Sequence, residues 1–275
     1  MFTYLEHASP LHRLNPSMKL LGMAVVALGA TFTFDPFIPG ALAVALWLTA
    51  WRLGRIPFRQ MLRWSVPLVV LPVPLMVFTA LYTDLSRYPQ PHTLWSWGPW
   101  TLAVEGLWVA LGLGLRVTTF LATSLLFIAT TDPTDFAVSL AQNMRLPYRF
   151  AYGLLVSMRF LPLLRREFEL IRLAHRVRGV EEARGLLGPI RQMRRYAVPL
   201  LASAIRKAER TALAMDAKAF GAYPQRTYYR QMPVRVRDVL FVLAWAAYVV
   251  LVYVAAFSLD VARLEVVPQA WMPLV

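Results

Sequence analysis

The sequence has no cysteine and only four histidines in 275 residues. A chain without cysteine forms no disulfides, no thiolate metal sites and no cysteine nucleophile. His7 and His12 lie near each other in the sequence but lack a clear carboxylate partner, so we expect them to be solvated or interfacial. We therefore predict no metal ion and no cofactor in this chain.

The motifs that catalysis would need are also missing. There is no Walker A phosphate-binding loop, so we do not expect this chain to hydrolyse ATP. No paired carboxylates and no nucleophile beside a base are visible, so we predict no catalytic residues. Residues 1–15 lack the basic stretch, apolar run and small-residue cleavage site of a signal peptide. The first apolar segment is thus expected to stay as a membrane anchor.

Charged residues are scarce for a folded chain. They make up 16% of the sequence, whereas hydrophobic residues make up 58%. A soluble globular domain has about 25% charged and roughly 45–50% apolar residues. This composition argues against a disordered chain, a collagen-like repeat and an ordinary cytosolic domain. It predicts an all-α membrane protein with several spans.

Five apolar segments are candidate spans, and the apolar part of the basic block between the last two is a sixth candidate, for a partial or complete span. They are residues 18–34, 37–53, 64–82, 100–131 and 239–259. A span needs about 17–25 residues, so the third and fifth fit and the first two are short. The fourth is too long for one upright helix, which predicts an interfacial or strongly tilted part. Three prolines in the third, Pro67, Pro72 and Pro74, predict a kinked span.

The basic residues in the connections predict the orientation. Arg52, Arg55, Arg59 and Arg63 lie between the second and third segments, with no acidic residue among them. Because cytoplasmic loops are enriched in Lys and Arg, this connection is expected inside the cell. The N-terminus is then cytoplasmic and the C-terminus external. We divide the chain into a membrane region 1–144, a basic cytoplasmic region 145–237 and a C-terminal helix with tail 238–275.

The whole formal net charge of +14 lies in residues 145–237. This block has 20 Lys+Arg and 6 Asp+Glu, and the remainder of the chain is neutral. Apolar residues recur in it at the helical intervals of three and four, which predicts two long amphipathic helices. The first run is Leu154, Met158, Leu161, Leu164, Phe168 and Ile171; the second is Leu201, Ile205, Ala208, Ala212, Met215 and Ala219. Each ends in a basic residue just before a glycine or small residue.

Three functions would suit such a block. A basic amphipathic helix lies well on anionic lipid, which explains the sign and the side of the charge but not a repeated cation at a helix end. Nucleic-acid binding would call for an interleaved aromatic platform and a known binding module, and we recognise neither in this block. Docking of the two helices into acidic grooves of partner proteins accounts for both the charge and its position.

Three stretches resemble the T component of energy-coupling factor (ECF) transporters, the EcfT/CbiQ-like family. One is the opening Ser9-Pro10-Leu11-His12-Arg13-Leu14-Asn15-Pro16-Ser17-Met18-Lys19. Another is Thr130-Thr131-Asp132-Pro133-Thr134-Asp135-Phe136, and the third is Arg159-Phe160-Leu161-Pro162-Leu163-Leu164 with Glu167 and Ile171. The resemblance covers nearly the whole chain.

The resemblance implies a scaffold subunit of an ABC-type importer in a bacterial or archaeal cell membrane. Such a subunit joins two ABC-type ATPases, which bind ATP and Mg, to a substrate-binding membrane protein, the S component. The cargo would be a vitamin, a vitamin precursor or a transition-metal ion such as cobalt or nickel. The alternative is a membrane-embedded lipid or sugar-phosphate transferase whose basic cytoplasmic face binds phosphates.

In this family, Ala-Arg-Gly-like motifs at the ends of two coupling helices insert a cation into each ATPase. Here the resemblance assigns that role to Arg178, between Val177 and Gly179, and to Lys218, between Ala217 and Ala219. Both depart from the motif, the second through Lys for Arg and Ala for Gly. A literal Ala183-Arg184-Gly185 makes Arg184 a lower-ranked alternative for the first cation.

Two further groups of residues are singled out. The apolar stripes of the coupling helices, including Met158, Leu161, Ile205 and Met215, are implied to contact the S component. Arg116 lies in the middle of the fourth apolar segment, where a charge is a candidate functional residue. We favour a structural role for it.

Overall fold

The fold was obtained as a computed structural model. It describes residues 9–33, 35–83, 92–97, 100–144, 146–179, 188–223, 228 and 230–258. The chain divides into two compact units, which are described separately. The membrane unit comprises residues 1–132 and 233–275. The inserted unit comprises residues 133–232.

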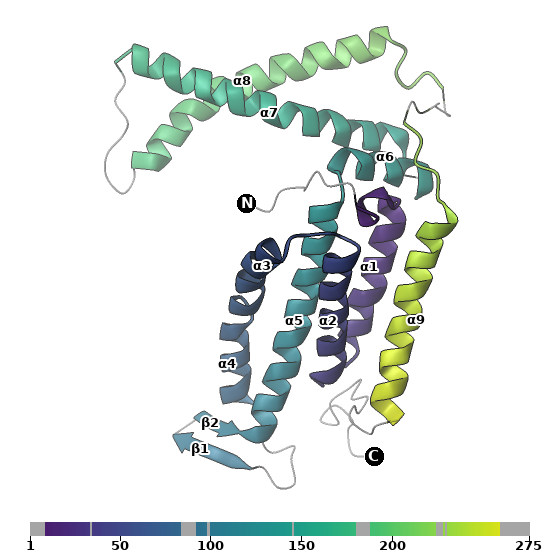
Figure 1. Cartoon of the computed structure of the whole chain (residues 1–275). Helices are drawn as coiled ribbons and strands as arrows, with labels where there is room; N and C mark the ends of the chain where they lie inside the picture. Colours follow the sequence, from purple (N-terminus) through teal and green to yellow (C-terminus); the bar gives the residue numbers. More distant parts are fainter. Residues whose placement is uncertain are drawn as a thin grey trace, which may run out of the picture. The chain divides into compact units, whose positions relative to one another are not determined.

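The membrane unit is a bundle of helices with one small β-hairpin. In chain order it contains η1 (Leu11–Arg13), α1 (Pro16–Thr31), α2 (Phe37–Arg52), α3 (Phe58–Val70), α4 (Val73–Tyr82), β1 (Thr93–Trp97), β2 (Trp100–Ala103), α5 (Val104–Thr130) and α9 (Val236–Ser258). Helices α1, α2, α5 and α9 lie side by side (Figure 1). Helix α1 runs parallel to α9 and α2 runs parallel to α5, and the two pairs run in opposite directions.

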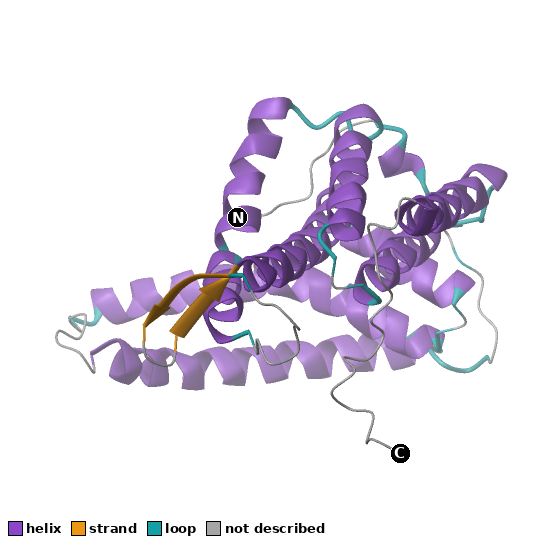
Figure 2. Ribbon diagram, turned by 90° about the horizontal axis from the view of Figure 1, so that it is seen from below, coloured by secondary structure: helices purple, strands orange, loops and turns teal. Residues whose placement is uncertain are grey.

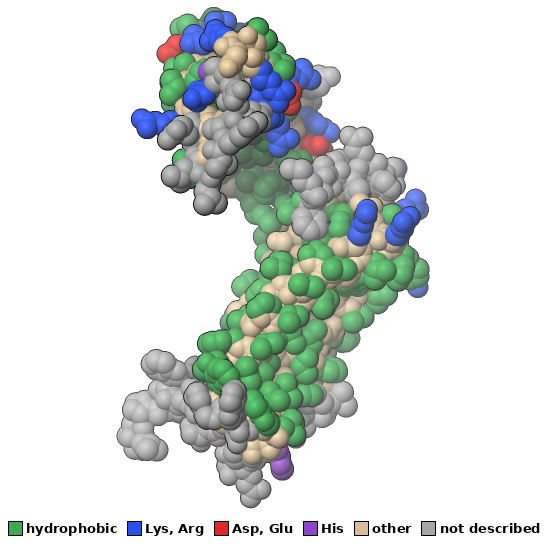
Figure 3. Space-filling view, turned by 90° about the vertical axis from the view of Figure 1, so that its left-hand side faces the viewer, with side chains coloured by type: hydrophobic (Ala, Val, Ile, Leu, Met, Phe, Trp, Pro, Cys, Tyr) green, Lys and Arg blue, Asp and Glu red, His purple; other side chains and the backbone are tan. Residues whose placement is uncertain are grey.

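The predicted all-α membrane fold is confirmed. Three helical segments are long and apolar enough to cross a membrane: Phe58–Tyr82, Val104–Thr130 and Val236–Ser258. Helices α1 and α2 are also apolar but have only 16 residues each, about 24 Å of helix against a hydrocarbon core of about 30 Å. The outer faces of the unit carry many exposed hydrophobic side chains, which Figure 3 shows as a nearly continuous apolar surface.

Two details differ from or refine the sequence prediction. The long fourth segment does not begin as a helix, because Trp100–Ala103 forms strand β2, which pairs antiparallel with β1 (Figure 2). Alternating aromatic and polar residues favour a strand there, and α5 starts only at Val104. The prolines of the third segment interrupt it as predicted, since α3 ends at Val70 and α4 begins at Val73.

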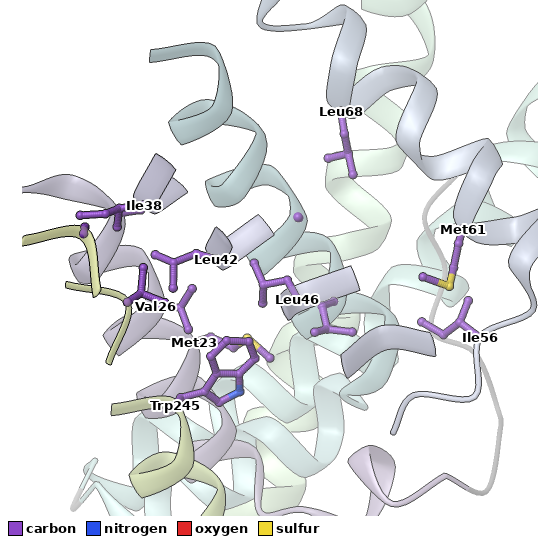
Figure 4. Packing of buried hydrophobic residues seen from close by; sticks show 14 residues of the cluster. Met23, Val26, Ile38, Leu42, Leu46, Ile56, Met61, Leu68 and Trp245 are labelled. Atoms are coloured by element: carbon purple, nitrogen blue, oxygen red, sulfur yellow. The ribbon is translucent and has the colours of Figure 1, made fainter. Parts of the chain in front are cut away.

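The core of the membrane unit lies between α1, α2, α3, α5 and α9 (Figure 4). Its buried members include Met23, Val26, Leu42, Leu46 and Trp245. Small residues allow α1 to approach α9 closely. A Cβ atom at Gly29 would lie 2.7 Å from a methyl carbon of Val249, and one at Gly22 would lie 2.9 Å from the ring of Phe241. These two glycines, one heptad apart, therefore set the α1–α9 distance.

The inserted unit contains α6 (Pro133–Asn143), α7 (Tyr148–Val177) and α8 (Gly188–Ala217). Both predicted amphipathic helices are present, and both are longer than their apolar runs. Figure 1 shows α7 and α8 crossing each other. The end of the unit is tied back to α6 by an Arg230–Asp135 ion pair of 2.7 Å and by the amide N–H of Met232, which donates to the Gln142 side chain at 2.8 Å.

Candidate functional site

A polar cluster around Glu167 and an aromatic pair hold α7 and α8 together where they cross. The Glu167 carboxylate on α7 accepts a hydrogen bond of 2.8 Å from the Ser203 hydroxyl and pairs with the Lys207 ammonium on α8. These donors lower the pKa of Glu167, the Lys207 contact having the largest effect and the Ser203 hydroxyl the next. On the other side of the crossing, the buried Tyr196 ring packs against Phe168, with ring centroids 5.6 Å apart.

Aromatic contacts extend the pairing to both ends of the helices. His175, near the end of α7, lies 5.4 Å from Tyr196, near the start of α8. Tyr152, near the start of α7, lies 4.8 Å from Phe220, just beyond α8. Early residues of one helix thus face late residues of the other, so the helices are antiparallel. At 1.5 Å per residue, their two C-terminal ends lie roughly 40 Å apart along the pair.

Arg178 is the residue at which α7 ends. Its own amide N–H still bonds the carbonyl of Ala174, at 3.2 Å. Gly179 follows with φ +73° and donates to the carbonyl of Arg176 at 2.9 Å. A left-handed residue with this hydrogen bond is a standard way to close a helix. The helix therefore ends at a basic residue just before a glycine, as the sequence pattern predicts.

Lys218 takes the same position at the end of α8. Ala219 follows it with φ +52° and donates to the carbonyl of Asp216 at 2.9 Å, and Phe220 donates to the carbonyl of Met215 at 3.0 Å. This pair of hydrogen bonds is the Schellman motif. The apolar spacing in the sequence predicts a helix that continues to Ala219. The helix ends at Ala217 because the chain turns left-handed two residues later.

Both cations are exposed at these caps. The side chains of Arg178 and Lys218 project from helix ends where unpaired carbonyls favour a positive charge. Over the part of the chain that the structure describes, neither side chain makes a hydrogen bond or ion pair. Val177, Gly179, Ala217 and Ala219 beside them are exposed as well. The alternative cation Arg184 lies outside the described residues.

The apolar positions singled out on the two helices are accessible to different degrees. Met158, Leu161 and Ile205 are exposed, at 42%, 53% and 50% of their full surface. Met215 is half-buried. Both helices therefore offer apolar side chains that the inserted unit itself does not cover.

Arg116 belongs to the membrane unit, on helix α5. Its guanidinium donates to the carbonyl oxygen of Thr33, in the turn between α1 and α2. Thr119 on the same helix donates to the carbonyl of Pro39 at 2.9 Å, and Tyr253 on α9 donates to that of Gly29 at 2.7 Å. A backbone turn inside apolar surroundings needs such partners. The structural role favoured for Arg116 agrees with these contacts.

Sequence reasoning missed a buried polar cluster at the opposite end of α1. Lys19 is 1% exposed, and its ammonium donates to the Thr130 carbonyl at 2.8 Å and to the Thr131 hydroxyl at 3.1 Å. Asp238 on α9 is also buried and accepts from the backbone amide of Asn15 at 3.1 Å. The sequence shows a lysine at the start of an apolar helix, which signals a buried polar contact. Only the fold shows which groups the lysine bonds. No cluster of metal-binding side chains occurs within the described residues.

The fold is that of a multi-pass membrane protein with an inserted, crossed pair of long basic helices. The CbiQ family model, described as "Cobalt transport protein", matches residues 7–229. The chain belongs to this family, so the resemblance in the sequence is confirmed.

Several known proteins are similar to this chain over most of its length. The energy-coupling factor transporter transmembrane protein EcfT of Heliobacterium modesticaldum is 29% identical over 257 residues, covering 90% of this chain and 94% of that protein. EcfT of Thermotoga maritima is 28% identical over 270 residues, covering 94% of each. A putative ABC transporter ATP-binding protein of Bifidobacterium longum is 27% identical over 256 residues, covering 90% of this chain but 31% of that longer protein.

Proposed function

We propose that this chain is the energy-coupling transmembrane component of an ECF-type importer, joining two ABC-type ATPases to a substrate-binding S component. The observation that carries the proposal is the equivalence of Arg178 and Lys218. Each stands at the cap of a long helix, before a left-handed residue, and the two lie at opposite ends of one antiparallel pair. Two equivalent contacts, set apart by a rigid spacer, suit a partner that presents the same groove twice.

The chemistry of the two contacts follows from the side chains. A cation at a helix end pairs with carboxylates in a partly desolvated groove, where charged hydrogen bonds are strong. The planar guanidinium of Arg178 can bind a carboxylate through two parallel hydrogen bonds. The ammonium of Lys218 acts as a single point charge. We therefore propose that the α7 end makes the more directional of the two contacts.

The proposed mechanism is mechanical. ATP and Mg bind to the partner ATPases, whose closure displaces the grooves that hold Arg178 and Lys218. Because Glu167, Ser203 and Lys207 join the helices at their crossing, a movement at either end is passed to the other helix. The exposed apolar side chains of Met158, Leu161 and Ile205, with Met215, then shift against the S component.

The names of the relatives support this assignment. EcfT proteins are named as energy-coupling factor transporter components. The Bifidobacterium protein named as ATP-binding contains a region similar to this chain within a longer polypeptide. A link between such a membrane component and an ATP-binding protein is consistent with ATPase partners here.

We place the cargo with the S component and propose a vitamin, a vitamin precursor or a transition-metal ion. We also propose that the inserted unit and the N-terminus face the cytoplasm of a bacterial or archaeal cell and that the C-terminus is external. The basis is the four-arginine connection between α2 and α3 together with the net positive charge of the inserted unit.

The test is the assembly of tagged chain with its ATPases. Arg178→Ala and Lys218→Ala should each weaken ATPase copurification and transport, since removing one partner of a buried interfacial charge pair costs about 2–5 kcal/mol. The matched control is Arg165→Ala with Arg210→Ala, which removes two exposed cations from the same helices, away from their C-terminal caps. Lys218→Arg should retain assembly. Normal assembly and transport of the Arg178→Ala/Lys218→Ala double variant would refute the proposal.

A further inference from the structure

A second group of cations lies at the connection between α2 and α3, outside the surface assigned to the ATPases. Arg52, Arg55, Arg59 and Arg63 fall within twelve residues, and residues 36–83 contain no Asp or Glu. All four side chains are exposed. The guanidinium of Arg52 lies 5.3 Å from the centre of the Trp51 ring. Arg55, Arg59 and Arg63 make no hydrogen bond or ion pair over the described part of the chain.

The backbone presents Arg55 in a fixed and unusual conformation. Its φ is +49°, a left-handed value that costs energy for any residue except glycine. Gly54 and Ile56 on either side are buried, and the amide N–H groups of Leu53 and Gly54 both bond the carbonyl of Thr49, at 2.9 and 3.0 Å. A glycine would suit the position better for folding alone. The chain nevertheless carries an exposed arginine at this position.

Helix α3 continues the cationic surface on one face. With 100° per residue, Met61 and Leu68 lie on the face that is buried in the bundle. Arg59 and Arg63, one turn apart, lie on the opposite face. The same outer face continues along the helix with Val66 and Val70, which are 60% and 59% exposed.

Exposed apolar side chains also flank the arginines. Phe58 and Leu62 are 66% and 56% exposed, beside Arg59 and Arg63 on the helix. Figure 3 shows Lys and Arg side chains gathered at one end of the hydrophobic face of the membrane unit. The surface thus has cations at the start of α3 and exposed apolar side chains beside them and further along the same helix.

We propose that this surface binds an anionic phospholipid. Arg55, Arg59 and Arg63 would bind the headgroup phosphate by charge-assisted hydrogen bonds, and the acyl chains would lie along Val66 and Val70. A lipid is favoured over an acidic protein because the outer face of α3 continues into the span that ends at Tyr82. A soluble partner has no access to that part of the surface. The uncompensated positive charge selects an anionic over a zwitterionic headgroup.

The test is a lipid titration of the purified full-length chain in neutral detergent, followed by native mass spectrometry. Phosphatidylglycerol and phosphatidylcholine are the two probes. The variant Arg55→Gln/Arg59→Gln/Arg63→Gln should lose phosphatidylglycerol affinity by about fivefold for each arginine, about a hundredfold in all. Its phosphatidylcholine binding should not change. The matched control, Arg194→Gln/Arg195→Gln/Arg210→Gln, removes three exposed arginines from α8 and should bind phosphatidylglycerol as the unaltered chain does.

A single variant separates folding from binding. Arg55→Gly should raise the melting temperature, because glycine adopts the left-handed conformation without strain, and should lower phosphatidylglycerol affinity about fivefold. Unchanged lipid affinity in Arg55→Gly or in the triple variant would overturn the proposal. So would an equal loss in the α8 control, which would mean attraction by net charge alone. If the triple variant binds lipid normally but loses a copurifying protein, the arginines serve an acidic partner and the lipid site is wrong.

Discussion

The ammonium nitrogen of Lys19 lies 2.8 Å from the carbonyl oxygen of Thr130, although the two residues are 111 positions apart. Lys19 is in the first turn of α1, and Thr130 is the last residue of α5. The carbonyl at a helix end lacks an intrahelical partner, so a buried cation satisfies it well. The contact joins the start of the bundle to the point where the chain leaves α5.

Replacing Lys19 tests this contact. Lys19→Met keeps the volume of the side chain but leaves the Thr130 carbonyl and the Thr131 hydroxyl without their buried donor. We expect a loss of about 2 kcal/mol in unfolding free energy, the usual size for a hydrogen bond to a charged group. Thermal unfolding of the purified chain measures it. Lys218→Met, at an exposed cation, should leave the melting temperature unchanged; equal melting of the two variants would contradict the prediction.

Gly29 should be intolerant of a side chain. Gly29→Ala places a methyl group against Val249 on α9, and overpacking of this kind costs about 1–3 kcal/mol. Gly153→Ala is the matched control, because its added Cβ meets nothing within 4 Å on α7. That variant should be neutral or slightly stabilising. Adding Val249→Ala to Gly29→Ala should restore much of the lost stability, and a failure to do so would place the damage elsewhere.

Ala219 carries a strain that glycine would remove. Ala219→Gly should stabilise the end of α8 by about 1 kcal/mol, because φ is +52° there. Ala217→Gly, two residues earlier and still helical, should instead destabilise it by about 0.5–1 kcal/mol. Hydrogen exchange of the last turn of α8 reports both. If Ala219→Gly and Ala217→Gly changed the stability of the last turn in the same direction, the turn would not be left-handed in solution.

The α7–α8 crossing should weaken in acid. The pKa of Glu167 lies below its ordinary value because Lys207 and Ser203 bond the carboxylate. A lowered folded-state pKa contributes stability above the unfolded-state pKa, and that contribution disappears as the pH falls through the folded-state value. The distribution of distances between two spin labels placed across the crossing should therefore broaden below about pH 4. Glu167→Gln should show the broader distribution already at neutral pH and little further change in acid.

The sequence located the long elements well and the polar contacts poorly. Runs of apolar residues in the spans and intervals of three and four in α7 and α8 are local signals, so they were readable from composition and spacing. The β-hairpin was missed because its strands are short and β2 lies within the long apolar run 100–131. The partners of Lys19 and Arg116 come from α5 and from the α1–α2 turn, and no local pattern encodes contacts across such distances.

The sequence by itself determined that this is a basic, multi-pass α-helical membrane protein, and it identified the two cations, Arg178 and Lys218, proposed to dock the ATPases. Hydropathy and charge are sums over neighbouring residues, so the chain order suffices to read them. Only the tertiary structure decided that both cations occupy equivalent caps at opposite ends of one antiparallel pair. It also decided that Arg55 is held left-handed beside two other exposed arginines. Both depend on backbone dihedral angles and on packing between distant segments, which follow from the folded whole.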